Sequence, residues 1–280
     1  MSIITVSRGS YSRGKEIAEK LAKRLGYKCI SRDSLFEDVE ELSTRDAKLI
    51  RSVEDIPSIF SRFRHGKETY ISYIQSTLLQ KLRKDNVVYE GFVGHVFLKD
   101  IPNVLKVRII SDYADRTNIV AERDNISKDQ ALKFIKRIDE QRKKWSQYLY
   151  EIDPSDPTQY DLVLNVKQIP VETVVDILTQ ISGLEQFQLT SEAKKRMDNL
   201  ALAAQIRNTL LCAYSDVEVS AEEGKVFVDT VISNNSRSEL ISEIERLAKT
   251  TPDVKEINLG FRISVPLSRE QVKENLVITP

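Results

Sequence analysis

The sequence feature that most constrains the fold is a glycine-bracketed loop close to the start of the chain. A short β-branched run, Ile3 to Ser7, comes directly before it, and apolar residues recur at helical spacing after it until Gly26, a residue type that often ends helices. Gly9 and Gly14 enclose four residues and are followed by Lys15, which gives the pattern GxxxxGK. This order predicts a strand, a loop and a helix, with most of a phosphate-binding P-loop between them.

A loop of this kind binds phosphate through its backbone. Glycines let N–H groups turn inward, the helix N-terminus adds free amides and a favourable dipole, and lysine adds a mobile positive charge. We therefore predict that the residues of this loop bind nucleotide phosphates: Gly9, Ser10, Tyr11, Ser12, Arg13, Gly14, Lys15 and Glu16. The alternative is an ordinary strand–turn–helix corner with no ligand.

Composition limits the class of protein. Lys and Arg number 42 and Asp and Glu also number 42, so no overall basic field favours nucleic acid, and we expect no nucleic-acid partner. No apolar run approaches the roughly 20 residues that a membrane span needs, and no signal-peptide pattern precedes the first predicted strand. The two cysteines, Cys29 and Cys212, lie far apart, which suits a reducing compartment. We expect a cytoplasmic protein with no transmembrane segment.

Strands and helices alternate through the first 183 residues. Short apolar runs predict strands at residues 27–30, 86–89, 104–110 and 162–166, and helical periodicity separates them. Such alternation implies a parallel sheet with helices on both faces. We therefore predict an α/β domain, with a long charged helical insertion over residues 43–85.

Polar residues at the carboxyl ends of two predicted strands are candidate ligand contacts, because open α/β sheets bind ligands at that edge. Arg32 and Asp33 follow the second strand, although Asp33 fits equally well as an N-terminal helix residue that matches the dipole. Glu90 and Gly91 end the third strand. A carboxylate there can hold Mg²⁺, and a glycine permits close approach of a ligand.

The sequence pattern changes after Gly183. Residues 184–195 are polar and predict a linker, and residues 196–266 read as helix, two strands, helix and strand. Strict alternation from Ile257 to Val265 predicts a half-exposed antiparallel strand, and residues 267–280 are expected to form a tail. The order α-β-β-α-β predicts a second, small α+β domain.

The first 183 residues resemble the cytidylate kinase-like family, within the P-loop nucleoside monophosphate kinases. The resemblance is carried by ITVSRGSYSRGKEIAEKLAKRLGY with SRD, then VVYEGFVGH, VLKVRII with Arg116 downstream, RIDEQR, and DPTQYDLVLNV. It implies a parallel sheet with mobile acceptor-binding and lid segments. It also implies ATP and Mg²⁺ as cofactors, and transfer of the γ-phosphate to a nucleoside monophosphate such as CMP or dCMP.

The resemblance implies roles for individual residues. The catalytic residues would be basic side chains of the P-loop and of the lid, a basic helix predicted to begin after a capping box at Ser127 and Gln130: Lys15, Arg137 and Arg142. The residues that contact the acceptor substrate would be Arg32, Asp33, Gly91 and Asp139. Glu90 would assist the metal. A solvated charged face remains the ordinary alternative for the basic helix.

Two positions depart from the family pattern. Glu16 and Ile17 stand where cytidylate kinases follow the P-loop lysine with Gly-Thr. Phe92 stands where they place an arginine that binds acceptor phosphate. These departures leave a second function open, a nucleotide-binding sensor that is catalytically weak or inactive and signals through its C-terminal domain.

Residues 197–265 resemble a BON domain. The resemblance is carried by RMDNLALAAQIRNTLL, VEVSAEEGKVFVDTVIS and IERLAKTTPDVKEINLGFRI. Domains of this kind are associated with lipid surfaces or protein partners, so we expect an interaction or regulatory module. The sequence shows no strongly basic amphipathic helix, which weakens the case for membrane contact.

Overall fold

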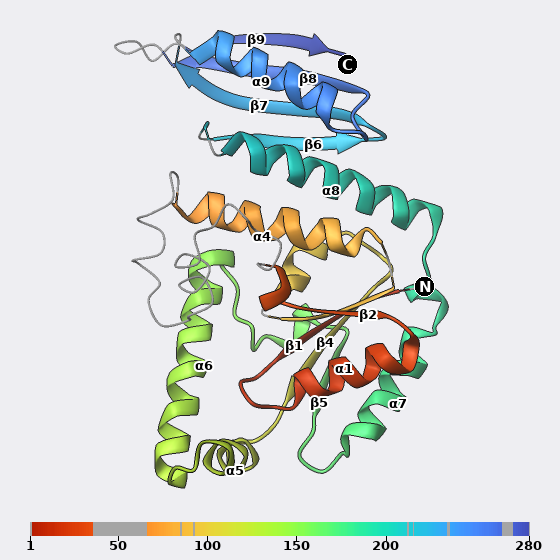
Figure 1. Cartoon of the computed structure of the whole chain (residues 1–280), viewed down its shortest axis with the longest axis vertical. Helices are drawn as coiled ribbons and strands as arrows, with labels where there is room; N and C mark the ends of the chain where they lie inside the picture. Colours follow the sequence, from red (N-terminus) through yellow and green to blue (C-terminus); the bar gives the residue numbers. More distant parts are fainter. Residues whose placement is uncertain are drawn as a thin grey trace. The chain divides into compact units, whose positions relative to one another are not determined.

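A computed structural model gives the fold of the chain (Figure 1). It describes residues 2–35, 66–84, 86–91, 93–211, 213–214, 216–233, 236–264 and 271–279. Phe92 and much of the predicted insertion lie outside the described residues. The chain divides into two compact units, Met1–Ile59 with Lys84–Ala193 and Phe60–Arg83 with Lys194–Pro280.

The first unit is built on a five-stranded parallel sheet in the order β2-β3-β1-β4-β5. Its strands are β1 (Ile3–Arg8), β2 (Lys28–Ser31), β3 (Val87–Glu90), β4 (Val104–Ile110) and β5 (Leu162–Asn165). Val, Ile and Leu dominate these strands, as expected for a sheet that is covered by other elements. The predicted parallel α/β architecture is confirmed. Because β1 is central, the loop that follows it opens between β3 and β4.

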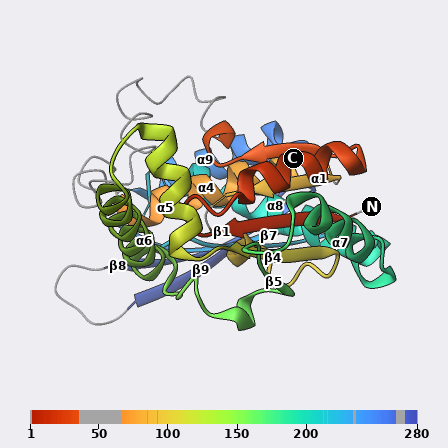
Figure 2. The same cartoon turned by 90° about the horizontal axis from the view of Figure 1, so that it is seen from below.

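Helices flank this sheet. The α-helices are α1 (Gly14–Leu25), α5 (Tyr113–Asp124), α6 (Lys128–Tyr150) and α7 (Val171–Ser182). Short 3₁₀ turns are η1 (Asp33–Leu35), η2 (Gly94–Leu98), η3 (Pro157–Gln159) and η4 (Glu185–Phe187). Helices α1 and α7 lie side by side (Figures 1 and 2), and their apolar faces share one core with Val107 and Ile109 of β4. This core fixes the start of α1, and therefore the loop, above the central strand.

Local signals set the ends of several helices. Asp112 caps α5 by accepting a 2.9 Å hydrogen bond from the Asp115 N–H. Ser127 and Gln130 form the predicted capping box at the start of α6. Gly26 ends α1 with φ 69°, a left-handed conformation that glycine adopts without steric cost.

In the part of the chain that the structure describes, the second unit combines three helices with a four-stranded mixed sheet in the order β6-β7-β8-β9. The helices are α4 (Gly66–Leu82), α8 (Ser191–Leu211) and α9 (Arg237–Thr250). The strands are β6 (Glu218–Glu222), β7 (Lys225–Ser233), β8 (Glu256–Ser264) and β9 (Gln271–Ile278). The predicted small α+β domain is therefore present. Among the helices that the structure describes, none has a stretch long and apolar enough to cross a membrane.

The pairing of β8 differs from the prediction of an antiparallel strand. It runs parallel to β7 and antiparallel only to β9. The reason is the connection, since α9 crosses over between β7 and β8 and brings the chain back in the same direction.

The ends of the predicted C-terminal domain also differ in detail. Strand β9 lies inside the expected tail, and Glu274 interrupts the alternation that would have signalled it. Helix α8 begins at Ser191, inside the expected linker of residues 184–195. Polar residues such as those of this stretch are as common in the first turn of a helix as in a linker. The domain boundaries themselves stay a prediction.

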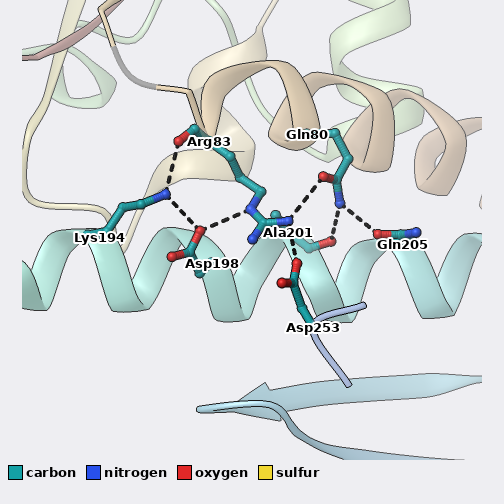
Figure 3. A network of polar contacts seen from close by, with 7 residues as sticks. All are labelled: Gln80, Arg83, Lys194, Asp198, Ala201, Gln205 and Asp253. Carbon is teal, nitrogen blue, oxygen red and sulfur yellow. Dashed lines mark hydrogen bonds and ion pairs between the residues drawn. The ribbon is translucent and has the colours of Figure 1, made fainter. Parts of the chain in front are cut away.

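Helix α4 follows β2 in sequence, yet it belongs to the second unit rather than to the predicted domain of residues 1–183. A network of polar contacts joins it to α8 (Figure 3). Arg83 forms ion pairs with Asp198 at 2.9 Å and with Asp253 at 2.8 Å. Gln80 donates to the carbonyl oxygen of Ala201 at 3.2 Å and to Gln205 at 3.0 Å. These pairings depend on residues more than 100 positions apart, which sequence patterns do not report.

Candidate functional site

The loop between β1 and α1 has an unusual backbone at two residues that are not glycine. Tyr11 and Arg13 adopt φ 59° and 60°, a region that side chains disfavour and that often marks functional loops. Between them, buried Ser12 places its hydroxyl 3.0 Å from the carbonyl oxygens of both Gly9 and Ile109, so its proton can bind either. Alternating conformations of this kind direct successive N–H groups to one side, which suits an anion.

The start of α1 adds donors to this loop. Arg13 is the N-cap residue, and its side chain makes no capping hydrogen bond. The amides of the first turn therefore lack the side-chain acceptor that usually satisfies one of them. Free amides at a helix N-terminus, together with the helix dipole, favour a bound phosphate.

The two glycines of the loop serve different purposes. A Cβ on Gly14 would lie 2.7 Å from Cβ and 2.8 Å from Cδ of Arg8, so this position admits no side chain unless Arg8 moves. The nearest atom to a Cβ on Gly9 would be an Arg116 nitrogen at 3.7 Å, an ordinary contact distance. A side chain at position 14 thus needs Arg8 to move, whereas a Cβ at position 9 would make only ordinary van der Waals contacts.

Arg8 and Glu90 form an ion pair between the ends of β1 and β3. Glu90 is buried, and its carboxylate already has a guanidinium partner. The sequence predicts that Glu90 assists Mg²⁺ and that Gly91 admits a ligand. In the structure a Cβ on Gly91 would collide with the Tyr89 hydroxyl, so packing within the chain explains this glycine.

Asp139 reaches the loop from α6. Its carboxylate accepts hydrogen bonds from the hydroxyl of Ser10 at 2.5 Å and from the Ser10 N–H at 3.4 Å. It also forms an ion pair with Arg116 at 2.7 Å, and Arg116 donates to the Ser10 carbonyl oxygen at 3.1 Å. Arg116 is only 6% exposed. The predicted acceptor contact Asp139 therefore binds the loop and Arg116 in this structure.

A cavity of about 220 Å³ opens beside the loop. The cationic side chains in its wall are Arg8, Arg108, Arg116, Arg142 and Lys143. Its acids are Asp139, which pairs with Arg116, and Asp153, which pairs with Lys143 at 2.8 Å. The charge balance is positive, and a positively charged concave site attracts polyanions.

Arg142 is the predicted catalytic residue that lies in this cavity. Within the described part of the chain its side chain has no ion pair or hydrogen bond, and burial together with the nearby Arg8 guanidinium lowers its pKa to about 10. Arg32 also contributes to this lowering of the Arg142 pKa. Arg142 is half-buried, with the carboxylate of Asp139 nearby but no ion pair in the described part of the chain, and a bound phosphate would supply one.

Three other predicted residues, Arg137, Lys15 and Glu16, do not line the cavity. Arg137 is exposed, with its guanidinium carbon 5.7 Å from the ring centroid of Phe134. Lys15 and Glu16 are exposed on the first turn of α1, where Lys15 lies 3.9 Å from Glu19 and Glu16 lies 3.1 Å from Lys20. Asp33 begins η1 directly after Arg32.

The carboxylates of the site fit Mg²⁺ only in part. Glu90, Asp139 and Asp153 each have a cationic partner, and no group of three or more His, Cys, Asp or Glu suited to a metal ion occurs among the residues described. Mg²⁺ commonly keeps several waters and takes one or two carboxylates plus substrate phosphates. The residues present fit a metal held mainly by nucleotide phosphates and water.

Sequence patterns missed two residues of the site. Arg108 lines the cavity from β4, and its terminal nitrogen lies 3.5 Å from the Ser7 hydroxyl and 3.4 Å from the Tyr160 hydroxyl. Tyr160 is buried and donates to the carbonyl oxygen of Pro154 at 3.0 Å. Alternation within β4 places Arg108 opposite the apolar face of the strand, but Lys106 carries the same signal.

Proteins named cytidylate kinase match about two thirds of the chain. The cytidylate kinase of Saccharolobus islandicus is 29% identical over 186 residues, which cover 66% of this chain and 93% of that protein. The cytidylate kinase of Ignicoccus hospitalis is 26% identical over 184 residues, or 65% of this chain and 99% of that protein.

Structure and family comparisons agree with these matches. A crystal structure of an uncharacterized protein from Eubacterium ventriosum has the same fold, with a TM-score of 0.50, 22% identity, and coverage of 65% of this chain and 98% of that one. The model of the cytidylate kinase-like family matches residues 3–168, more than half of the chain. With the loop, the parallel sheet and the cationic cavity in place, the chain belongs to the cytidylate kinase-like family.

Proposed function

We propose that this protein is an ATP-dependent nucleoside monophosphate kinase that transfers the γ-phosphoryl group of ATP to CMP or dCMP. The observation that carries the proposal is the Arg142 guanidinium, without an anionic partner in the described part of the chain, beside a loop whose amides suit phosphate. Membership of a kinase family and the likeness to proteins named cytidylate kinase support it.

Phosphoryl transfer needs positioning and charge neutralisation more than covalent chemistry from the protein. In the proposed enzyme, amides of the loop and of the first turn of α1 hold the β- and γ-phosphates, and Lys15 leaves Glu19 to join them. Arg142 neutralises charge on the transferred group, and Arg137 would reach it only if α6 closes as a lid. Mg²⁺ bound with ATP would neutralise further phosphate charge. Arg32, Asp33 and Gly91 remain the proposed acceptor side, with Asp139 released from Ser10.

A non-catalytic nucleotide sensor is the second candidate, because the motif residues Lys15 and Glu16 both pair with neighbours on the exposed face of α1. In that case Asp139 acts as an internal anion that nucleotide displaces from the loop. The sensor and the enzyme both bind ATP, but only the enzyme releases ADP when a monophosphate is present.

The variant Arg142→Ala separates these candidates. In an enzyme, kcat should fall by on the order of a hundredfold while ATP affinity changes much less, because the charge matters most in the transition state. In a sensor, there is no turnover to lose and only affinity changes. Lys144→Ala is the matched control, since Lys144 is an exposed cation on the same helix that pairs with Glu140. Unchanged kcat and unchanged affinity in Arg142→Ala would refute the role of Arg142 in either function.

We also propose that the second unit, which resembles a BON domain, binds a protein partner through the face of its sheet that carries Phe227 and Val277. Phe227 and Val277 are 44% and 60% exposed there and line a hollow of about 590 Å³. Glu218 and Asp229 share this hollow, and their charge disfavours an anionic membrane. A photo-crosslinker at position 227 should capture a protein in cells of origin, and co-sedimentation with anionic vesicles would contradict the proposal.

A further inference from the structure

Arg108 stands out among the cavity residues because of the sheet face from which it emerges. Its neighbours in sequence, Val107 and Ile109, are buried in the core with α1 and α7. Since successive residues of a strand point to opposite faces, Arg108 lies on the other face, where it lines the cavity with Arg142. Its register partner on β1 is Ser7, the residue next to Arg8 and the loop.

Most hydrogen-bond donors of the Arg108 guanidinium have no partner among the described residues. Within the described residues its contacts are two long hydrogen bonds from one nitrogen, to Ser7 at 3.5 Å and to Tyr160 at 3.4 Å. Neither partner is charged, and no carboxylate pairs with it in that part of the chain. Arginine carries five N–H donors in a planar fork, which matches the geometry of phosphate oxygens.

Tyr160 holds Arg108 in place without neutralising it. The tyrosine ring lies 5.6 Å from the guanidinium carbon and 4.7 Å from the ring of His95, and its hydroxyl binds the Pro154 carbonyl oxygen. Burial lowers the pKa of His95 to about 4, so this ring is uncharged at neutral pH. The arrangement orients the fork and leaves its charge for a ligand, which lowers the entropy cost of binding.

We propose that Arg108 is a further phosphate-binding residue of this site, and that it acts with Arg142 as a pair of guanidinium groups on one phosphate dianion. The proposal rests on the proposed nucleotide substrate, but it concerns binding and not turnover. The phosphate is either that of the monophosphate acceptor or a terminal phosphate of ATP. Both carry the same dianion chemistry, and separate titrations distinguish them.

The experiment is calorimetric titration of the full chain with ATP and, separately, with CMP. Arg108→Met should lower the affinity for one of these ligands by roughly tenfold to a hundredfold, as expected for loss of a charge-assisted bidentate contact. Arg108→Lys should recover part of the loss, because it keeps the charge but not the fork. Weaker CMP binding assigns Arg108 to the acceptor, and weaker ATP binding assigns it to the donor.

Lys106→Met is the matched control, because Lys106 lies two residues earlier on the same face of β4 and does not line the cavity. This variant should bind both ligands within about twofold of wild type, as expected when no contact is lost. The proposal is overturned if Arg108→Met binds both ligands with wild-type affinity. It is also overturned if Lys106→Met loses as much affinity as Arg108→Met does. Wild-type binding without turnover overturns only the proposed enzyme, and wild-type protein that binds neither ligand overturns both.

Discussion

The carboxylate of Asp139 on α6 accepts a 2.5 Å hydrogen bond from the hydroxyl of Ser10 in the phosphate loop. The same carboxylate pairs with Arg116 at 2.7 Å. One acid therefore connects the predicted lid helix to the predicted phosphate loop and neutralises a buried guanidinium. A phosphate that binds the Ser10 amide has to compete with this carboxylate.

Asp139→Ala should lower the free energy of unfolding by about 1–3 kcal/mol, because it leaves the Arg116 guanidinium buried without its anion. Urea denaturation measures this. Glu140→Ala is the control, since Glu140 is an exposed neighbour on α6 that pairs with Lys144, and it should cause no measurable loss. Equal stability of the two variants would show that the Asp139 contacts do not contribute.

The glycines of the loop should respond differently to alanine. Gly14→Ala places a Cβ against Arg8 and should cost about 1–3 kcal/mol of stability through displacement of that side chain. Gly9→Ala meets no atom closer than 3.7 Å and should leave stability nearly unchanged. Thermal denaturation of both variants tests the contrast. A Gly14→Ala protein as stable as Gly9→Ala would contradict the close approach of Arg8 to α1.

The network in Figure 3 predicts that Arg83 holds α4 against α8. Arg83→Ala removes two ion pairs of a side chain that is 22% exposed and leaves Asp198 with Lys194 alone. We expect a loss of about 1–2 kcal/mol in the stability of the second unit, and faster hydrogen exchange of α4 amides. Lys84→Ala, which changes the adjacent exposed cation, should leave exchange in α4 as it is in wild type.

The stability of the first unit should fall in mild acid because of His95. Burial lowers its pKa from 6.5 to about 4 in the folded chain. Between these two values the unfolded chain binds the extra proton and the folded chain does not, so the free energy of unfolding decreases as pH falls. The free energy of unfolding should decrease by about 2 kcal/mol from about pH 7 to about pH 5.

His95→Gln provides the comparison for this pH effect, because glutamine does not titrate. Denaturant unfolding of both proteins at the two pH values measures it. The only other histidine, His65, is outside the described residues and is present in both proteins, so its contribution cancels. A wild-type pH dependence no steeper than that of His95→Gln would show that His95 titrates normally.

Local sequence signals predicted most elements of the first unit. The run VLKVRII coincides with β4, and Ser127 with Gln130 marks the start of α6, because strand propensity and capping depend on residues close in sequence. Ser236 and Glu239 also have the spacing of a capping box, which predicts a helix start there. Ser236 is the N-cap of α9, but its side chain makes no capping hydrogen bond.

Tertiary placement accounts for what the sequence could not predict. Lys106 and Arg108 carry the same charge and lie on the same face of β4, and only the position of the cavity distinguishes them. Asp139 and Ser10 are 129 residues apart, so no local pattern could show that a predicted acceptor contact binds the loop. The packing of α4 in the second unit likewise depends on Arg83 and on partners that are distant in sequence.

Phosphoryl transfer from ATP to a pyrimidine nucleoside monophosphate is tested by ADP release from the wild-type chain. The protein is incubated with Mg-ATP and, in turn, with CMP, dCMP, UMP, AMP and GMP, and ADP is measured in each reaction. We expect ADP formation that depends on a monophosphate and is fastest with CMP or dCMP. ATP binding without ADP release for any of these acceptors would contradict the enzyme and favour the sensor.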